Sequence, residues 1–309
     1  MKAMKNIIIY ILFVMAGLSA YSQQNPLYTQ YMFNPFVVNP ALTGTHDYYQ
    51  VWLNSRMQWV GMTDAPVTNT LSIYGPLENH DMGVGGYVYS DITGPTSRLG
   101  ANGAYAYNLA INEDLRLSMG IFAGFVQYKM DKTQIEFEQP ESDFFTKEVY
   151  FLPDASVGVY MYNNFLHVGI SATQLFNSKL DFIQEAFDTE EDSLKYNSVF
   201  GRLKSHFYLT GGYRYFFSSD IAIEPTLIMR IVAPSSPQVD FNVRVIYQNM
   251  VWGGVAFRSQ DALSFIAGYA HDKKIFLGMS YDIGVNKLSP SHIGSFEVVV
   301  GFLFDSIKL

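Results

Sequence analysis

The chain has 309 residues with a formal net charge of −8, from 20 Lys and Arg against 28 Asp and Glu, and an acidic chain without a basic stripe is a poor candidate for binding nucleic acid. Charged residues make up 16% of the chain and aromatic residues another 16%, a composition that excludes intrinsic disorder and is unusual for a soluble enzyme. The sequence has no cysteine, so disulfides, thiolate metal sites, a cysteine nucleophile and a lipid anchor on cysteine are excluded.

Residues 1–22 have the pattern of a secretory signal peptide. Lys2 and Lys5 precede an apolar run, and small residues at Ala20 and Ser22 mark a cleavage site before Gln23. The apolar run is shorter than the roughly 20 residues that cross a bilayer, so an uncleaved helical anchor is the weaker alternative. We therefore predict an exported chain, and its strand-rich composition favours a closed β-barrel, the other structure that a bilayer permits.

Residues 23–47 are too rich in Asn and Pro to form a strand. We predict a periplasmic or plug-like segment in which the Asn-Pro pairs at 34–35 and 39–40 act as rigid turns. Residues 31–44 would pack in or beneath the periplasmic mouth of the barrel, and a periplasmic contact for a partner protein is the alternative. The residues expected to form the plug or the partner contact are Tyr31, Met32, Phe33, Asn34, Pro35, Asn39 and Pro40.

From residue 48 onward, apolar and polar residues alternate over segments of about ten residues, the pattern of membrane-barrel strands. Val239, Phe241 and Val243, for example, share one face, while Asp240 and Asn242 share the other. We predict that residues 48–309 form an all-β, transmembrane outer-membrane β-barrel of about 14 antiparallel strands. The expected strands span residues 48–60, 66–75, 81–91, 98–110, 114–129, 154–162, 165–176, 204–217, 220–233, 238–248, 250–260, 262–271, 274–284 and 294–305.

The connections between these segments alternate between tight turns and longer links. In bacterial barrels, short turns lie on the periplasmic side and long loops lie outside. The two longest links, about residues 130–153 and 177–203, fall outside by this count and are rich in Asp and Glu. Cargo-facing loops would explain that composition, but solvated loops without a partner explain it more simply. The tight turns are residues 112–114, 163–164, 218–220, 248–249 and 272–274.

A secreted β-sandwich is the soluble alternative, because its strands also alternate. The placement of aromatic residues disfavours it. Phe207 lies near one end of an outward face, and Tyr213, Tyr215 and Phe217 lie near the other end, as in the two interfacial girdles of a membrane barrel. A sandwich would bury that row.

The N-terminal string QNPLYTQYMFNPFVVNPALTG, residues 24–44, closely resembles the opening of the PorP/SprF family of outer-membrane proteins of the type IX secretion system. Further similar stretches follow in the same order: residues 117–131, 153–180, 206–217 and 279–302. The resemblance covers essentially the whole mature chain. It implies a barrel in the outer membrane of a Gram-negative bacterium that works with protein secretion and with surface attachment or gliding adhesins.

The partners that the resemblance implies are outer-membrane lipid, periplasmic secretion-ring proteins or a periplasmic linker protein, and secreted cargo or a large surface adhesin. The sequence does not decide between a core part of the secretion apparatus and a dedicated partner of one adhesin. A channel or transporter for a small solute is the alternative function, although inward faces rich in Arg, Asn, Ser and Gly disfavour a fatty acid as that solute.

Candidates for catalysis or cofactor binding are weak. The six histidines include none at metal-ligand spacing. His167 and Ser171 share an inward face, but positions i and i+4 of a strand are about 13 Å apart, so they are best explained as lumen lining. The glycines of residues 83–89 precede no helix, which rejects a phosphate loop, and they would let a strand bend or a plug approach closely. We expect no cofactor, no metal and no catalysis.

Inward-facing charges are the more informative feature. A network that neutralises itself is the favoured interpretation, because buried charges must be paired; a lined channel or a docking surface for a plug is the alternative. A 14-stranded barrel is wider than the eight-stranded size that side chains alone can fill, so a plug or water must occupy the lumen. The expected network comprises Arg56, Arg116, Arg214, Glu224, Arg230, Asp240, Arg244, Arg258, Asp282 and Glu297.

Overall fold

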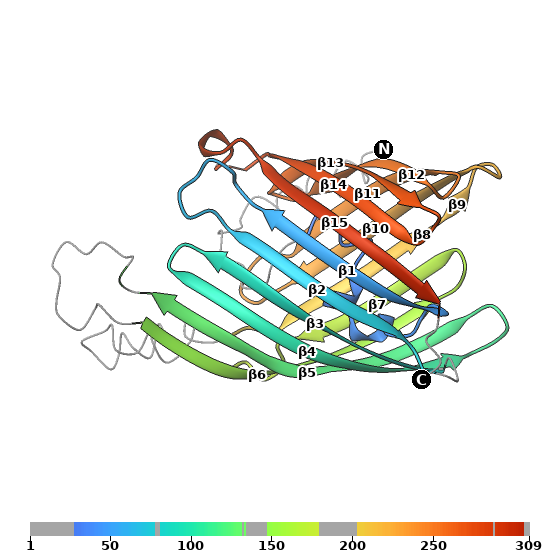
Figure 1. Ribbon diagram of the computed structural model, residues 1–309, viewed down its shortest axis with the longest axis horizontal. Coiled ribbons are helices and arrows are strands. Elements are labelled where there is room, and N and C mark those ends of the chain that lie inside the picture. Colours follow the sequence, from blue (N-terminus) through green and yellow to red (C-terminus); the bar gives the residue numbers. More distant parts are fainter. Residues whose placement is uncertain are drawn as a thin grey trace, which may run out of the picture.

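The computed structural model describes residues 28–77, 81–131, 133, 147–178, 203–286 and 288–305. These residues form one antiparallel sheet whose strands tilt across the molecule and curl into a barrel (Figure 1). Its elements are η1 (Pro35–Val38), η2 (Pro40–Leu42), β1 (Tyr48–Met57), β2 (Val67–Pro76), β3 (Met82–Thr93), β4 (Thr96–Ala110), β5 (Arg116–Asp131), β6 (Lys147–Tyr162), β7 (Leu166–Thr173), β8 (His206–Tyr213), β9 (Tyr215–Phe216), β10 (Ile221–Ile231), β11 (Gln238–Tyr247), β12 (Val251–Arg258), β13 (Ala262–His271), β14 (Ile275–Gly284), η6 (Ser289–Ser291) and β15 (Ser295–Asp305).

The barrel is closed. Strands adjacent in sequence are paired, β15 returns to pair with β1 along the whole length of β1, and β11 pairs with β10. Both β8 and β9 pair with β10, so they are two parts of one interrupted strand. The described residues therefore form a 14-stranded antiparallel barrel without a free edge, which confirms the expected fold. Closure satisfies the backbone hydrogen bonds that an open edge would leave unpaired.

The two ends of the barrel differ in their connections. One end, here called the turn end, carries the links 77–81, 111–115, 163–165, 217–220, 248–250 and 272–274, and β1 starts there. The other, the loop end, carries the links 58–66, 94–95, 132–146, 174–205, 232–237, 259–261 and 285–294. The expected tight turns all lie at the turn end. However, the links 94–95 and 259–261 are as short as those turns, so the expected alternation in length is not strict.

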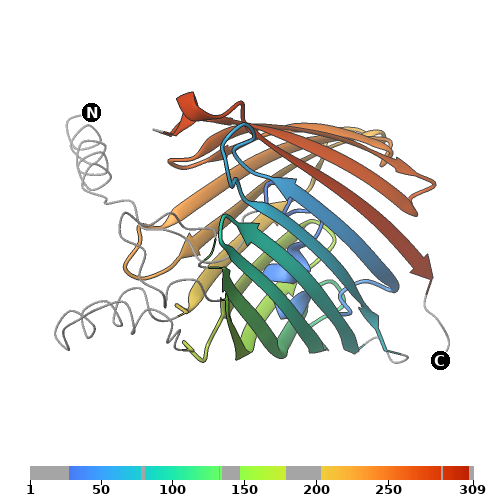
Figure 2. The same ribbon diagram turned by 60° about the vertical axis from the view of Figure 1, so that its left-hand side comes forward.

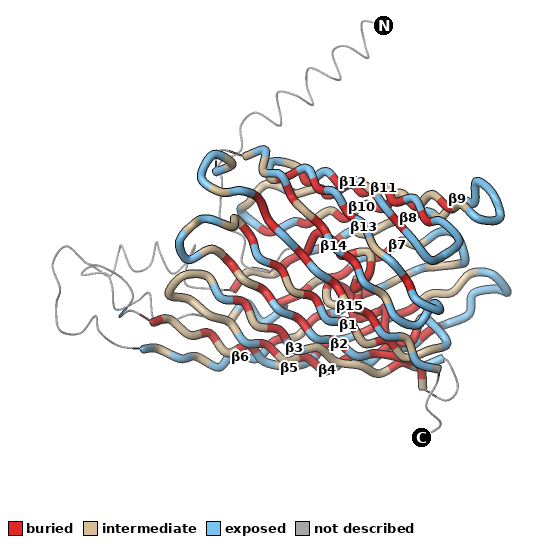
Figure 3. The backbone as a smooth tube through the Cα atoms, turned by 45° about the horizontal axis from the view of Figure 1, so that its top comes forward, coloured by how far each residue is buried: buried red, intermediate tan, exposed pale blue. Residues whose placement is uncertain are grey.

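Exposure alternates along each strand, as Figure 3 shows. In β11, Phe241, Val245 and Tyr247 are exposed on the outer face, whereas Asp240 and Asn242 are buried toward the lumen. The period of two that the sequence predicts is therefore the inside–outside pattern of the barrel wall. The expected girdle residues are likewise exposed on the outer surface: Phe207, Tyr213, Tyr215 and Phe217.

One strand boundary was predicted wrongly. β6 starts at Lys147 rather than near residue 154, so its first residues lie in what was expected to be a long link. Pro153 pairs with Phe125 of β5, but the pairing of β6 with β7 covers only Val157 to Tyr162. The first half of β6 thus has one partner strand, and a proline is tolerated where its missing N–H would have pointed away from the ladder. The other strand bounds agree with the structure to within three residues.

A second proline explains the interruption between β8 and β9. The register places Ile223 opposite Tyr215 and Thr226 opposite Gly212, so Pro225 lies opposite Tyr213, the last residue of β8, directly beside the interruption at Arg214. Because proline has no backbone N–H, it cannot donate to the neighbouring strand there.

The expected signal peptide, residues 1–22, and most of the two acidic links lie outside the described residues. Within the described part of the chain, no helix is long and apolar enough to span a membrane.

Candidate functional site

Residues 28–47, here called the inner segment, lie inside the barrel (Figure 2). The segment folds as two short 3-10 helices, η1 and η2, each with a proline in its first turn, where a missing N–H costs nothing. Asn39 caps η2, because its Oδ1 accepts a hydrogen bond from the Ala41 N–H at 3.0 Å. The Asn-Pro pairs therefore do fix turns, as their sequence indicates.

The inner segment runs along the lumen from the loop-end half to the turn end. Near its start, the Thr29 N–H donates to Glu297 Oε2 at 2.7 Å, and Glu297 lies close to the loop end of β15. Near its finish, Asn108 Nδ2 donates to the Gly44 carbonyl at 3.2 Å, and Asn108 lies close to the turn end of β4. The segment thus occupies the length of the lumen rather than a position beneath one mouth.

Aromatic side chains of the inner segment form the core of the molecule with inward residues of the wall. The Phe36 ring stacks on Tyr74 at 4.2 Å between centroids and meets Phe122 edge-on at 5.1 Å. The Phe33 ring lies between Trp52 and Trp252, at 6.0 and 4.9 Å. Such contacts bury large apolar areas and prefer these tilted and stacked geometries.

Polar bonds join the inner segment to strands all around the wall. Most of these bonds use an inward side chain of the wall that would otherwise be a buried, unsatisfied group. The bonds run from Tyr28 Oη to Thr70 at 2.6 Å, Tyr31 Oη to Thr226 at 3.2 Å, Asn34 Nδ2 to Asn54 at 3.0 Å, Asn39 Nδ2 to the Val159 carbonyl at 3.2 Å, Ser72 Oγ to Asn34 at 3.1 Å and Ser171 Oγ to the Val38 carbonyl at 2.6 Å.

Inward glycines of the wall make room for the backbone of the inner segment. A Cβ atom placed on Gly120 would lie 2.5 Å from the Pro40 carbonyl, and one on Gly83 would lie 2.5 Å from the Thr43 carbonyl. These distances are too short for any side chain, so the close approach requires glycine. Of the glycines in residues 83–89, Gly83 therefore permits close approach of the segment, whereas Gly85 and Gly86 face neighbouring strands of the wall.

We expect Gly120→Val to displace the inner segment or to destabilise the protein by about 1–3 kcal/mol, the usual cost of overpacking. In a Trp59→Phe background, the two remaining tryptophans both contact Phe33, so displacement should shift their fluorescence to longer wavelength. Gly103→Val is the matched control, because a Cβ there meets nothing closer than 3.8 Å. Equal spectra and stabilities for the two variants would contradict the close fit.

A charge network lines the lumen at the loop-end half and holds Thr29. The Arg56 guanidinium lies 2.6 Å from Asp282 and 3.2 Å from Glu297. Thr29 Oγ1 donates to Asp282 at 2.8 Å and accepts from Arg56 at 2.7 Å, while the Gln30 N–H donates to Glu297 at 3.1 Å. The wall charges therefore pair with one another and with the inner segment. Arg258 extends the network through Asp240 at 3.0 Å, Asp261 at 3.0 Å and Asp282 at 3.8 Å, and Arg230 joins it through Asp240 at 3.9 Å.

A second, smaller cluster is separate from the first. Glu224 accepts from Arg214 at 2.6 Å and from Arg244 at 2.7 Å, and the Arg244 guanidinium lies over the Phe33 ring at 4.6 Å. Arg116 belongs to neither cluster, contrary to its expected place in the network: it pairs at 3.0 Å with Asp81 near the turn end, and its side chain is 35% exposed. Arg116 sits at the end of its strand, where the inward face opens to solvent.

The structure brings the candidate residues of the inner segment together in the lumen. Asn34 and Asn39 bond to the wall, Tyr31 and Phe33 are buried in it, Met32 packs against its core, and Pro35 and Pro40 start the two helices. The sequence analysis missed Thr29 and Gln30, which carry no local signal. It also missed the inward Trp52 and Trp252, although Trp52 shares the alternating face of Arg56 and could have been found from it.

The remaining candidates have structural contacts. The Ser171 hydroxyl donates a hydrogen bond to the Val38 carbonyl. The His167 ring stacks on the Tyr160 ring, with 5.8 Å between their centroids. Among the described residues, no three His, Asp or Glu side chains are grouped to hold a metal ion.

Known proteins resemble the chain in sequence or in structure. Residues 20–302 match the model of the family described as type IX secretion system membrane protein PorP/SprF. No curated protein matches the chain. Similar solved structures include the CymD monoaromatic hydrocarbon channel, with 14% identity over 95% of this chain and 96% of that one and a TM-score of 0.49. A Pseudomonas aeruginosa FadL homologue has 11% identity over 86% and 92%, with a TM-score of 0.47. The Acinetobacter baumannii protein Omp33 has 8% identity over 84% and 99%, with a TM-score of 0.47.

Proposed function

Because the chain belongs to the PorP/SprF family of type IX secretion system membrane proteins, we propose that it is a non-enzymatic outer-membrane component of that system. In this proposal it supports export or cell-surface anchoring of secreted proteins or gliding adhesins through protein–protein contacts. The exposed apolar outer face provides the contact with membrane lipid.

The observation that carries this proposal is the occupied lumen. The inner segment bonds to strands around the wall and buries Phe33 and Phe36 in the middle of the barrel. A lumen filled in this way offers no wide path for a solute, so the two ends of the barrel are the surfaces left for function. This argument disfavours the small-solute channel, which remains the alternative that a conductance measurement would revive.

The short turns indicate how the proposed barrel is oriented in the outer membrane. Bacterial barrels keep short turns in the periplasm and long loops outside, so the turn end would meet periplasmic secretion-ring proteins or a periplasmic linker protein. The loop end would meet secreted cargo or a large surface adhesin. Each surface offers an exposed residue at which a cross-linker can be placed: Glu113 at the turn end and Thr63 at the loop end.

We expect a photoreactive amino acid at position 113 to cross-link to a periplasmic partner in living cells, and one at position 63 to cross-link to surface protein. Mass spectrometry of each product identifies the partner. Ring components captured from position 113 would mark a core part of the secretion apparatus, and one large adhesin captured from position 63 without the ring would mark a dedicated partner. If neither position captured a secretion protein, the proposed role would be wrong.

A further inference from the structure

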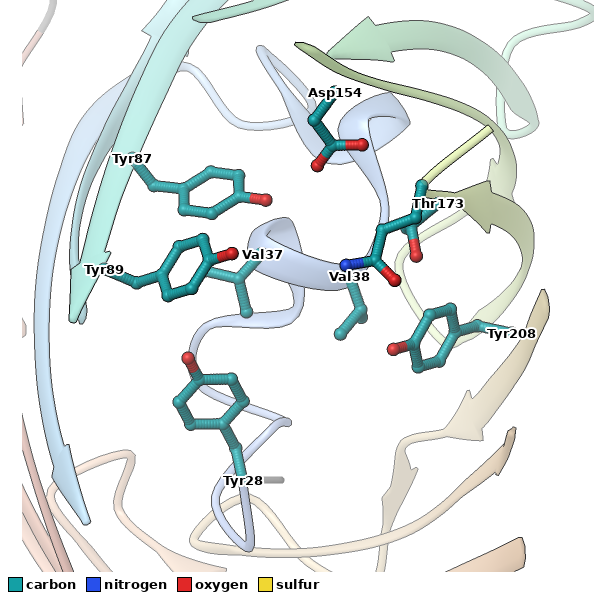
Figure 4. Close-up of a pocket in the computed structure, with 9 residues that line it drawn as sticks. Tyr28, Val37, Val38, Tyr87, Tyr89, Asp154, Thr173 and Tyr208 are labelled. Atoms are coloured by element: carbon teal, nitrogen blue, oxygen red, sulfur yellow. The ribbon is translucent and has the colours of Figure 1, made fainter. Parts of the chain in front are cut away.

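A small cavity lies on the loop-end side of the inner segment. Val37 and Val38 of η1 form its floor, and its walls come from β3, β6, β8 and the end of β7. Four tyrosine rings surround the space in Figure 4, and the hydroxyl groups of Tyr87, Tyr89 and Tyr208 point inward. Its volume is about 40 Å³. A single water needs roughly 10–15 Å³, so the cavity holds a small group and not a sugar or an acyl chain.

Asp154 supplies a carboxylate to this cavity. Its side chain points into the space between Tyr87 and Thr173 (Figure 4), and the residue is 8% exposed. The backbone N–H groups of Ala155 and Gln174 donate to it, which fixes its orientation. No described residue forms an ion pair with Asp154. A carboxylate taken out of water in this way is costly without a positive partner.

Gln174 supplies a second acceptor, independently of Asp154. The residue is 6% exposed, it lines the cavity, and its Oε1 atom is buried without a hydrogen-bond partner. Its φ of +56° places it in the left-handed region, which residues other than glycine rarely adopt. Buried polar atoms are almost always paired in folded proteins, so an unpaired carbonyl oxygen and a carboxylate without an ion pair among the residues that line one cavity indicate a donor that enters it.

Two arginines that interact with tyrosines of this cavity, Arg98 and Arg230, have other partners. Arg98 stacks on the Tyr128 ring at 5.0 Å and lies 3.9 Å from Asp91. Arg230 lies 5.7 Å from the Tyr208 ring and donates to Gln238 at 2.8 Å. Neither is an ion-pair partner of Asp154.

From this arrangement we propose that the cavity binds a primary ammonium group, of the kind carried by a lysine side chain. The carboxylate provides the opposite charge, and the Gln174 carbonyl and the tyrosine hydroxyl oxygens accept the N–H hydrogen bonds. The volume fits the ammonium head and the last methylene groups. This site goes beyond the secretion role, because it rests on the chemistry of the cavity alone.

The test uses the purified full-length protein in detergent and Nα-acetyl-lysine methylamide as the probe, with binding followed by saturation-transfer NMR. The matched neutral probe is Nα-acetyl-norleucine methylamide. We expect the lysine probe to bind and the norleucine probe to bind at least about tenfold more weakly, which is the effect of losing one charged hydrogen bond. Equal binding of the two probes would overturn the proposal.

Three variants test whether the lysine probe binds in the cavity. Asp154→Asn should weaken the lysine probe about tenfold or more, and Gln174→Met, which keeps the size but removes the acceptor, should weaken it severalfold. Asp64→Asn, which changes the same charge at an exposed position of the loop end, should have no effect. Because Gln174→Met leaves the carboxylate in place, it also tests the site if Asp154→Asn fails to fold.

The ammonium group could come from another molecule or from this chain, and a further variant separates the two sources. Lys179→Gln/Lys195→Gln/Arg202→Gln/Lys204→Gln removes the basic residues of the link 174–205. Binding of the probe to the wild-type protein indicates a site open to an external lysine. Binding only to the quadruple variant indicates that a basic side chain of the link occupies the site. Binding to neither protein would refute the ammonium site.

Discussion

Deletion of residues 24–43 should turn a closed barrel into a conducting one. The deleted residues include Phe33 and Phe36, which fill the centre of the lumen, and Thr29, which engages the wall charges. The wall of 14 strands would remain, and barrels of this width leave space that side chains alone cannot fill. Single-channel recordings in planar bilayers should show discrete openings with a conductance about tenfold or more above the wild-type background.

The deletion needs a control for folding, because it removes contacts to many strands. Heat-modifiable migration in detergent gels shows whether the barrel has formed. Adding a synthetic peptide of residues 24–44 should close the channel again if the lumen is intact. Unchanged conductance in a folded deletion variant would show that the inner segment is not what closes the lumen, and conductance in the wild-type protein would revive the small-solute channel.

The barrel wall was predictable from sequence because its physical cause is local. Alternation of apolar and polar residues is set by the two faces of each strand, so Phe241 and Asp240 reveal the wall without knowledge of their neighbours. The prediction failed at the start of β6, where the end of the strand depends on which neighbouring strands pair with it. Pro153 marks the end of a strand in most sheets, but here the β7 side of β6 is unpaired at that residue, and only the register between β6 and β7 shows this.

The lumen was only partly predictable, because its contacts join residues far apart in the chain. The inward charges were evident from alternation, but their division into a cluster around Arg56 and another around Glu224 depends on the order of strands around the barrel. A plug-like position for residues 31–44 was predicted, but the path of the inner segment along the whole lumen was not. Thr29 lies 268 residues from its partner Glu297, and no local pattern distinguishes a threonine that bonds a carboxylate from one that faces water.

Replacement of Arg56 by Met should be among the most destabilising single changes in the chain. Arg56 is 1% exposed and pairs with both Asp282 and Glu297. Methionine keeps much of the volume but removes the cation that neutralises the two buried carboxylates. The positive charge that remains near them is Arg258, which lies 3.8 Å from Asp282. Breaking a buried ion pair from one side costs about 3–5 kcal/mol. Unfolding by guanidinium chloride in detergent, followed by tryptophan fluorescence, measures the change.

Arg116→Met is the matched control for this substitution. Its pair with Asp81 is partly exposed, at 35% and 55% for the two side chains, and pairs of this kind contribute about 1 kcal/mol or less. In the variant Arg56→Met/Asp282→Asn/Glu297→Gln, neutral amides replace the two carboxylates and their carbonyl oxygens can still accept hydrogen bonds from Thr29, so most of the lost stability should return. If Arg56→Met cost no more than Arg116→Met, the buried network would not be what fixes the start of the inner segment, and the aromatic packing of Phe33 would have to hold it alone.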